Sequence, residues 1–430
     1  MGIFMQGGGH AEADRREGVL IKGGKVMNED LKEFLTIDDL DVEGKTVFFR
    51  ADINTVVVDG KVQMKERIKE NAKTIRELSA KEAKVVILAH QGRPGGADFL
   101  PLEQHAELLR NFVDLRYIDD VMGPAARDAI RKLSDGEVLL LDNVRLLAEE
   151  TLQRTPEEHA KSIFVQKLAP LADIYINDAF SVAHRSHASV VGFPVVLESG
   201  IGRLMERELR ALRRAVHSIR RPCIYVLGGV KSEEVFDVME HTLKRGKVNK
   251  ILTAGTLGTL FLYARDIIEP SEEDKRNRKF MENLARAKRI LELGDDKIKC
   301  PKDVAVEVNG KRREIPANSV KPEQKVYDIG EETAKEYAEE IKGARTVIMK
   351  GPAGWYEREA FRKGTEEILR ALASSDAFSL IGGGHTSAAM STLGINKQKL
   401  PHTHVSLAGG AFLHYLLEKN LPGIEVLKRY

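Results

Sequence analysis

The sequence predicts an α/β protein with two doubly wound parallel-sheet domains joined by a hinge helix. At 430 residues the chain is long for one hydrophobic core, which favours two domains. Short apolar runs rich in β-branched residues alternate with amphipathic stretches, a pattern typical of parallel sheets covered by helices. A charged stretch with a helical pattern separates two sets of such runs.

Four apolar runs predict the strands of the first sheet, at residues 46–53, 84–90, 138–144 and 173–178. Each run is continuous rather than alternating, as expected for strands buried on both faces. Helical patterns lie between them, for example at 65–82. We therefore expect a first domain over residues 34–201. The polar, glycine-rich segment before it, residues 1–33, is expected to be a flexible N-terminal extension.

The stretch GIGRLMERELRALRRAVHSIRRP is charged, helical by pattern and closed by Pro222, so we expect a hinge helix over 202–221. Residues 222–404 are then the second domain, and 405–430 are expected to pack back on the first. Between the later strands, EVNGKRREI predicts a hairpin that turns at Asn309-Gly310. Five apolar runs predict the second sheet, at residues 222–229, 250–255, 346–352, 377–384 and 404–410.

Composition excludes several classes of protein. The chain has 67 basic and 65 acidic residues, without the basic excess of a dedicated nucleic-acid binder. Its two cysteines are too few for a disulfide framework or a cysteine zinc site, and so low a number fits a reducing cytoplasm. No apolar run approaches the roughly 18 residues of a membrane helix. We expect a cytoplasmic protein, monomer or homodimer, with small-molecule partners and neither nucleic acid nor membrane.

Cationic side chains follow the strands of the first half. Guanidinium groups bind phosphate and carboxylate oxygens through paired hydrogen bonds, and ligands of such sheets bind at the carboxyl ends of strands. The sequence therefore predicts a site for a small, highly charged anion. The residues are Arg50, His90, Arg93, Arg145, His184, Arg185 and His187.

Two features of this half have alternative interpretations. His184 and His187 have the spacing of a metal-ligand pair, but no third His or Cys is close in sequence, which favours anion binding. Asp52 and Asn54 alternate onto one face and suit the hydroxyl of a sugar acid, although they also fit a turn that ends a strand. Arg67 is by pattern a solvated helix charge, and only its expected nearness to Arg50 makes it a candidate.

Glycines follow the strands of the second half. Glycine turns that open onto helices suit a nucleotide, because their backbone N–H groups can approach its phosphates. None matches a Rossmann or P-loop motif. Lys231 could neutralise a transferring phosphoryl group, and Glu357 is a possible ribose partner. Sites for two different anions suggest phosphoryl transfer between them. The glycine motifs are LGGVK (227–231), LTAG (252–255), KGPAG (350–354), IGGGH (381–385) and LAGG (407–410).

From about Phe34 to the C-terminus the chain resembles the phosphoglycerate kinase family. RADIN (50–54) is similar to the family's R-V-D-x-N, and AHQGRP (89–94) to its H-x-G-R-P. INDAFSVAHRSHAS (176–189) nearly repeats N-D-A-F-x-x-A-H-R-x-H-A-S. The resemblance implies two α/β domains with a hinge, and reversible phosphoryl transfer between 1,3-bisphosphoglycerate and ADP with Mg²⁺.

The resemblance also assigns roles, residue by residue. No direct protein ligand to the metal is implied, because Mg²⁺ would be held mainly by the nucleotide phosphates. The acid would bind to Asp52, Asn54, Arg67, His90, Arg93, Arg145 and Arg185. Catalysis would fall to Arg67, Lys231, Gly384 and Gly409. The nucleotide would bind to Gly228, Gly229, Lys231, Gly255, Lys350, Pro352, Glu357, Gly383, Gly384, His385 and Thr386.

The chain departs from the family pattern mainly in its glycine-rich half. A His after three glycines and a missing second lysine also resemble the archaeal branch. Two alternatives stay open: a paralogous kinase with a changed acid or phosphate donor, and a non-catalytic relative that binds a phosphorylated acid. The altered positions are Val56 for Pro, Val235 for Lys, Lys350 for Asn, His385 for Asp, and Leu407 and Ala408 for Thr-Gly.

Overall fold

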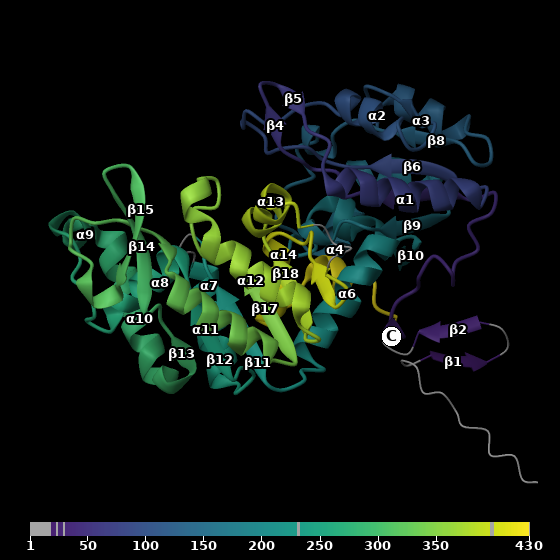
Figure 1. Ribbon diagram of the computed structural model, residues 1–430. Helices are drawn as coiled ribbons and strands as arrows, with labels where there is room; N and C mark the ends of the chain where they lie inside the picture. Colours follow the sequence, from purple (N-terminus) through teal and green to yellow (C-terminus); the bar gives the residue numbers. More distant parts are fainter. Residues whose placement is uncertain (1–18, 23–24, 29–30, 230–232, 396–399, 430) are drawn as a thin grey trace, which may run out of the picture.

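The computed structural model describes residues 19–22, 25–28, 31–229, 233–395 and 400–429. Two lobes follow one another along the chain, and the C-terminal segment (yellow) runs from the second lobe back to the first (Figure 1). Each lobe is built on a six-stranded sheet whose neighbouring strands all run parallel. The predicted α/β fold is confirmed.

The first sheet has the strand order β10-β9-β3-β6-β8-β7. All four predicted strands are present, and each is almost entirely buried, which explains their continuous apolar runs. The edge strands β7 and β10 are additional. The strands are β3 Thr46–Arg50, β6 Lys84–Leu88, β7 Arg116–Tyr117, β8 Val138–Leu140, β9 Ile174–Asn177 and β10 Glu198–Ile201.

The second sheet has the order β13-β12-β11-β17-β18-β19. All five predicted strands are present, and β13 adds one edge. In both sheets the chain crosses over several times, so that carboxyl ends of distant segments meet at one edge. The strands are β11 Cys223–Leu227, β12 Lys250–Thr253, β13 Ile298–Lys299, β17 Thr346–Lys350, β18 Phe378–Gly382 and β19 Thr403–Val405.

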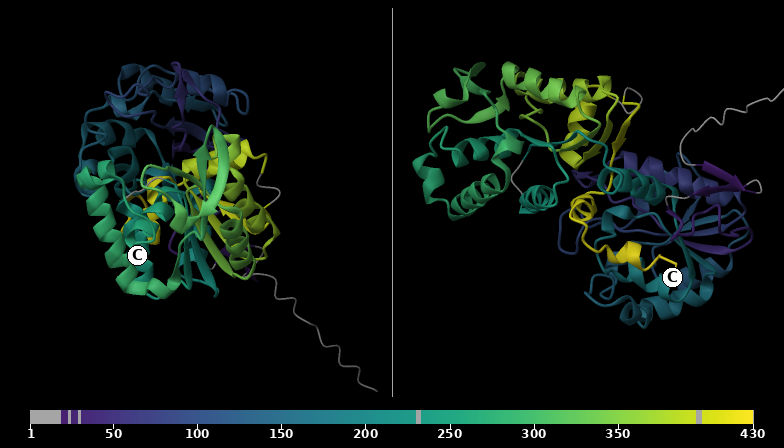
Figure 2. Two further views of the ribbon diagram at one scale, coloured as in Figure 1. Left: turned by 60° about the vertical axis from the view of Figure 1, so that its left-hand side comes forward. Right: turned by 90° about the horizontal axis from the view of Figure 1, so that it is seen from below.

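Helices cover both sheets (Figure 2). None of the helices in the described part of the chain combines the length and apolarity that a membrane span requires. In the first half they are α1 Glu66–Ala80, α2 Glu103–Leu109, α3 Pro124–Arg131, α4 Pro156–Ala160, α5 Ile163–Leu168 and α6 Arg203–Val216. In the second half they are α7 Glu233–Lys244, α8 Gly255–Ala264, α9 Glu272–Arg276, α10 Arg278–Gly294, α11 Glu331–Lys342, α12 Lys363–Ser374, α13 Gly384–Thr392, α14 Gly410–Leu416 and α15 Pro422–Glu425.

A small antiparallel sheet of order β15-β14-β16 projects from the second lobe. Its strands are β14 Asp303–Val308, β15 Lys311–Pro316 and β16 Val326–Ile329. Asn309 and Gly310 connect β14 to β15 with φ of 50° and 73°. Positive φ at both turn positions is the geometry of a tight hairpin, so the predicted hairpin is confirmed.

Helix α6 lies between the two sheets in sequence, inside the range expected for the hinge helix. Asp178, at the end of β9, caps it by accepting a hydrogen bond from the Met205 N–H at 2.8 Å. A side chain on Gly202 would lie 2.4 Å from the Asp178 carboxyl carbon, so the helix can begin only at a glycine. Arg203 then binds Glu77 of α1 and Asp38 at 2.6 Å each.

The ends of the chain contain further structure. Within the segment 1–33, strands β1 Val19–Lys22 and β2 Lys25–Asn28 form an antiparallel pair, and Leu31 is buried. Residues 1–18 lie outside the described part of the chain. Near the other terminus, the Gly423 N–H donates to Ala183 O at 2.9 Å.

Within the first lobe, the two short strands β4 Val57–Val58 and β5 Lys61–Val62 form a separate hairpin.

Four aromatic rings fill the core beside β3 and β9. Phe193 makes edge contacts with Phe48 at 5.5 Å and Phe164 at 5.3 Å between ring centroids, and it stacks on Tyr175 at 5.8 Å. All four side chains are buried. Edge-to-face aromatic contacts add to the stabilisation that burial provides.

Phe193→Ala should therefore lower the free energy of unfolding by about 3–5 kcal/mol, the cost of a cavity left by a buried ring. Val195→Ala is the matched control, because Val195 is nearby in sequence and 42% exposed. Chemical denaturation followed by circular dichroism measures both variants. Equal stability of the two would show that the aromatic cluster is not a stabilising core.

Candidate active site

The carboxyl ends of four neighbouring strands bring the predicted acid-site residues together. Arg50 at the end of β3 is in register with Asn177 of β9 and Leu88 of β6, and β8 lies beyond β6. The loops that follow these strands therefore emerge side by side. They carry Asp52, Asn54, His90, Arg93, Arg145 and Arg185.

Arg93, Arg145 and Arg185 form a cationic cluster at this edge. In the described part of the chain none of the three makes an ion pair. Burial, together with the nearby charges of Arg50, Arg185 and Arg93, lowers the pKa of Arg145 to about 10, and Glu150 opposes the change. Burial and Arg93 likewise lower the pKa of Arg185. The Nε of Arg145 is buried without a hydrogen-bond partner. Crowded guanidinium groups without carboxylates are a site for an anion.

Asp52 and Asn54 lie beside the cluster. The Asp52 side chain is 1% exposed and its oxygens accept no hydrogen bond from the described residues, although Oδ1 is 3.5 Å from Nη1 of Arg67. A buried carboxylate with free lone pairs suits a substrate hydroxyl. Asn54 is used internally, because its Oδ1 accepts a hydrogen bond from the Gly92 N–H at 2.9 Å.

Arg50 is completely buried and supports His90 from behind. Its Nη2 lies 3.0 Å from Nδ1 of His90. A guanidinium group can only donate, so Nδ1 must accept and the ring proton must be on Nε2. Burial lowers the pKa of His90 well below its usual value, and Arg50 and Arg145 add to the effect. His90 is therefore neutral and offers one N–H, at Nε2, as a donor.

Glu150 provides the counter-charge for Arg50. Ser189 connects them: its Oγ accepts from Nε of Arg50 at 2.8 Å and donates to Oε1 of Glu150 at 2.7 Å, while its N–H donates to Oε2 at 2.7 Å. Both oxygens of the carboxylate thus accept, as expected of the ionised form. Burial raises the pKa of Glu150, and Arg50 opposes the rise. The chain Glu150–Ser189–Arg50 fixes His90.

The two histidines with metal-ligand spacing do not form a metal site with other side chains. Within the described residues no group of three His, Cys, Asp or Glu side chains is placed to hold a metal. His184 instead lies 5.1 Å, between ring centroids, from His414 of α14. Burial, followed by Arg185, lowers the pKa of His184 to about 4. Burial, followed by Arg145, lowers that of His187 to about 3.

In the second lobe, the predicted glycines lie against one another. The Gly228 N–H donates to Lys350 O at 2.8 Å, that of Gly229 to Pro352 O at 2.8 Å, and that of Gly255 to Ala353 O at 2.9 Å. A side chain on Gly228 would lie 2.3 Å from Pro352 O. The ends of β11, β12 and β17 can therefore meet only because these residues lack side chains.

The end of β18 completes this edge. Gly383 has φ of 101°, and Gly384, the first residue of α13, has open space where a side chain would be. Lys350 lies next to Gly383, and burial lowers the pKa of its ammonium group. Thr386 is buried: its Oγ1 accepts from the Gly351 N–H at 2.9 Å and donates to Gly382 O at 3.2 Å.

The remaining predicted residues of this half differ in their surroundings. His385 and Glu357 are exposed, and Pro352 is buried. Lys231, predicted to be catalytic, lies outside the described residues.

Arg67 connects the two halves of the site. From α1 its Nη2 donates to Leu407 O at 2.6 Å, and its Nη1 donates to Asn54 O at 3.3 Å. A side chain built on Gly409 would lie 3.5 Å from Nη2. The loop that carries Leu407 is held by Glu208 of α6, which accepts from the Leu407 N–H at 2.7 Å.

Comparison with known proteins decides the family. A family model described as phosphoglycerate kinase matches residues 37–419. The phosphoglycerate kinase of Methanobacterium bryantii is 45% identical over 400 residues, which are 92% of this chain and 97% of that protein. The chain belongs to the phosphoglycerate kinase family. That of Methanopyrus kandleri is 44% identical over 395 residues, 91% of this chain and 97% of its own length.

A solved structure agrees with this assignment. The crystal structure of phosphoglycerate kinase from Pyrococcus horikoshii OT3 is similar with a TM-score of 0.84 and 38% identity, over 91% of this chain and 98% of that one. The predicted resemblance is confirmed. The chain is a phosphotransferase that moves a phosphoryl group between 1,3-bisphosphoglycerate and ADP, giving 3-phosphoglycerate and ATP.

Sequence reasoning missed the residues that support this phosphoglycerate kinase site from behind. Ser189 is the last residue of INDAFSVAHRSHAS, and Glu150 follows shortly after Arg145. Nothing in these stretches of sequence tells a supporting side chain from one that meets substrate. By its sequence pattern, Glu208 would be a solvent-exposed acidic residue of a charged helix. Only its burial, at 1% exposure, together with the bonds it accepts from Ser406 at 2.8 Å and from Leu407, shows its role.

Arg50→Met should destabilise the first lobe by about 3 kcal/mol or more, because Glu150 stays buried without its counter-charge. The double variant Arg50→Met/Glu150→Gln should regain most of that stability, since no buried charge is then left over. The KM for 3-phosphoglycerate should be higher in both variants than in the unmodified chain, because His90 has lost the donor that fixes its tautomer. Urea unfolding and steady-state kinetics measure the two effects, and a double variant no more stable than the single one would contradict the role of Glu150.

Proposed function

We propose that 3-phosphoglycerate binds at the carboxyl end of the first sheet and the nucleotide at that of the second. The cluster of Arg93, Arg145 and Arg185 carries this proposal, because three neighbouring guanidinium groups that form no ion pair within the described residues suit a strongly anionic ligand. Nε2 of His90 donates to an acceptor of the acid, and Asp52 accepts from its hydroxyl. Asn54 contributes by shaping the loop, because its own side-chain oxygen is already bonded to Gly92.

We propose the matching roles for the second lobe. The N–H groups around Gly383 and Gly384 face the phosphates at the start of α13, with Lys350 and Lys231 as cations. Glu357 and Pro352 meet the nucleoside. Mg²⁺ would be held mainly by the nucleotide phosphates, because no group of three acidic, His or Cys side chains among the described residues is placed to hold a metal. When bound, it would neutralise charge on the phosphate oxygens. The other members of the proposed nucleotide site are Gly228, Gly229, Gly255, His385 and Thr386.

We also propose that the lobes act as two domains, 34–201 and 222–404, which close about α6. Closure would bring the acid carboxylate in line with the terminal phosphoryl group. A carboxylate oxygen then bonds to the γ-phosphorus while the bond from that phosphorus to the β–γ bridging oxygen breaks, so that ADP leaves with the electron pair. Arg67, with the N–H groups of Gly384 and Gly409, stabilises the charge on the group in transfer.

The small number of cysteines, both unpaired, suits a cytoplasmic location.

A coupled assay with ATP, Mg²⁺ and 3-phosphoglycerate tests the proposal. We expect saturable turnover with the acid as acceptor. Binding of 3-phosphoglycerate without turnover at saturating Mg²⁺ would instead favour a non-catalytic binding protein. Turnover with another carboxylic acid alone would favour a paralogous kinase.

Arg67→Ala should lower kcat by about 10²-fold or more while the nucleotide Kd changes little, because the lost cation acts on the group in transfer rather than on bound nucleotide. Arg76→Ala is the matched control: this arginine lies on the same helix, outside the proposed site. Steady-state kinetics and nucleotide titration measure the two quantities. Equal losses in kcat and in nucleotide affinity would contradict a role for Arg67 at the phosphoryl group in transfer.

A further inference from the structure

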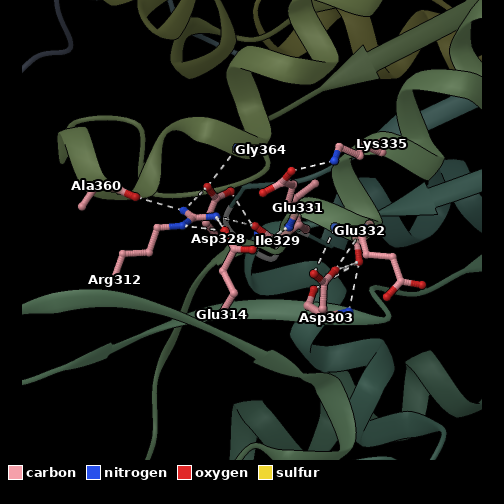
Figure 3. Close-up of polar contacts among 11 residues, drawn as sticks. Asp303, Arg312, Glu314, Asp328, Ile329, Glu331, Glu332, Lys335, Ala360 and Gly364 are labelled. Carbon is pink, nitrogen blue, oxygen red and sulfur yellow. Dashed lines mark hydrogen bonds and ion pairs between the residues drawn. The ribbon is translucent and has the colours of Figure 1, made fainter.

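A buried ion pair supports the nucleotide loop, defined here as residues 351–357 (Figure 3). Nη1 of Arg312, on β15, lies 2.8 Å from Oδ2 of Asp328, on β16. Their side chains are 10% and 0% exposed. Desolvating two charges costs about as much as their attraction returns, so a pair buried this deeply indicates a role in fixing structure.

Every nitrogen of the Arg312 guanidinium group is engaged. Besides Asp328, Nη1 donates to Ala360 O at 2.9 Å, and Nη2 donates to Ile329 O at 3.0 Å. Glu314 accepts from Nε at 3.0 Å and from Nη2 at 2.8 Å. These contacts tie the projecting hairpin to β16 and to the segment that follows the nucleotide loop.

Asp328 lies between the nucleotide loop and the first turn of α12. Its Oδ2 also accepts from the Gly364 N–H at 3.0 Å, and its Oδ1 accepts from the Ile329 N–H at 3.0 Å. A side chain on Gly354 of the loop would lie 2.2 Å from Oδ1. The loop backbone therefore rests directly on this carboxylate.

The loop has further anchors on the same two elements. Oγ1 of Thr365, the neighbour of Gly364, accepts from the N–H groups of Ala353 at 3.0 Å and Gly354 at 3.3 Å. The Trp355 N–H donates to Tyr327 O, next to Asp328, at 2.8 Å. From the other side, Pro352 and Ala353 carbonyls hold Gly229 and Gly255. The ion pair is thus linked through the loop to the glycines of the nucleotide site.

We propose that Arg312 and Asp328 are positioning residues for nucleotide binding, acting through the loop that they anchor. Neither residue touches the reacting atoms. The hairpin β14–β15, which carries none of the motifs of the family resemblance, thereby governs nucleotide affinity. This inference rests on the proposed assignment of residues 351–357 to the nucleotide.

Arg312→Met tests the proposal, with Arg313→Met as the matched control. Arg313 is the next residue on the same strand and is exposed, and it makes no ion pair within the described ranges. ADP is titrated into the full chain by calorimetry in the absence of the acid. Arg312→Met should weaken ADP binding by about tenfold, the scale of one lost charge-assisted contact. Arg313→Met should leave ADP binding unchanged, and the KM for 3-phosphoglycerate should stay within about twofold in both.

The loop also contains a spectroscopic reporter. Trp355 is the single tryptophan of the chain, and it stacks on Tyr327 at 5.5 Å between ring centroids. Arg312→Met should therefore shift the tryptophan emission to longer wavelength, whereas Arg313→Met should not. Arg312→Lys, which retains the charge, should give intermediate ADP affinity, and it replaces Arg312→Met as the test if that variant does not fold.

Unchanged ADP affinity and emission in Arg312→Met would overturn the proposal. So would equal losses for ADP and 3-phosphoglycerate accompanied by a lower melting temperature, which would show a general structural role. Because ADP binding is measured without turnover, an unmodified chain that binds ADP but does not phosphorylate 3-phosphoglycerate would defeat the proposed function and leave this inference standing.

Discussion

The proposed acid site depends on one buried negative charge, that of Glu150. Arginines at the carboxyl ends of the first sheet repel one another, and burial, with this repulsion adding to it, lowers the pKa values of Arg145 and Arg185. Glu150 and Ser189 compensate Arg50 from inside the protein, where no substrate can reach. The outer guanidinium groups have no carboxylate partner among the described residues, although Nη1 of Arg145 donates to Gly92 O, and the inner one is fixed to orient His90. The innermost arginine is compensated, whereas the outer three have no carboxylate partner in the described part of the chain, and this difference favours the binding of an anion.

The second site is formed by close backbone contact rather than by charge. Gly228 and Gly351 approach so closely that a side chain on either would overlap the other's loop. The two halves therefore have different structural requirements. The first keeps like charges close together against their repulsion, and the second brings several strand ends into backbone contact. This difference explains why arginine and histidine mark one set of strand ends and glycine the other.

Much of this arrangement could be predicted from the sequence. The strands at 46–53 and 346–352 were predictable because both faces are buried and the apolar runs are unbroken. The hairpin at Asn309-Gly310 was predictable because few other residues adopt two consecutive positive φ angles. The supporting residues were not. Glu208, Asp328 and Glu150 are ordinary acidic residues in sequence, and their roles come from burial and from partners far along the chain. Thr386 shows the reverse case, because a motif residue that looks available for a ligand has its hydroxyl bonded inside the protein.

The bond from Arg67 to Leu407 O bears on how water is kept from acting as an acceptor. In the structure Nη2 of Arg67 donates to Leu407 O of the opposite half and Nη1 donates to Asn54 O, so in its proposed role the guanidinium group would exchange at least one of these partners for the phosphoryl group. Binding of the acid supplies interactions that can drive such an exchange, and a water molecule does not. If Arg67 acts as proposed, the contact with Leu407 would work against wasteful hydrolysis of ATP, because the arginine would become available only when the proper acceptor is bound.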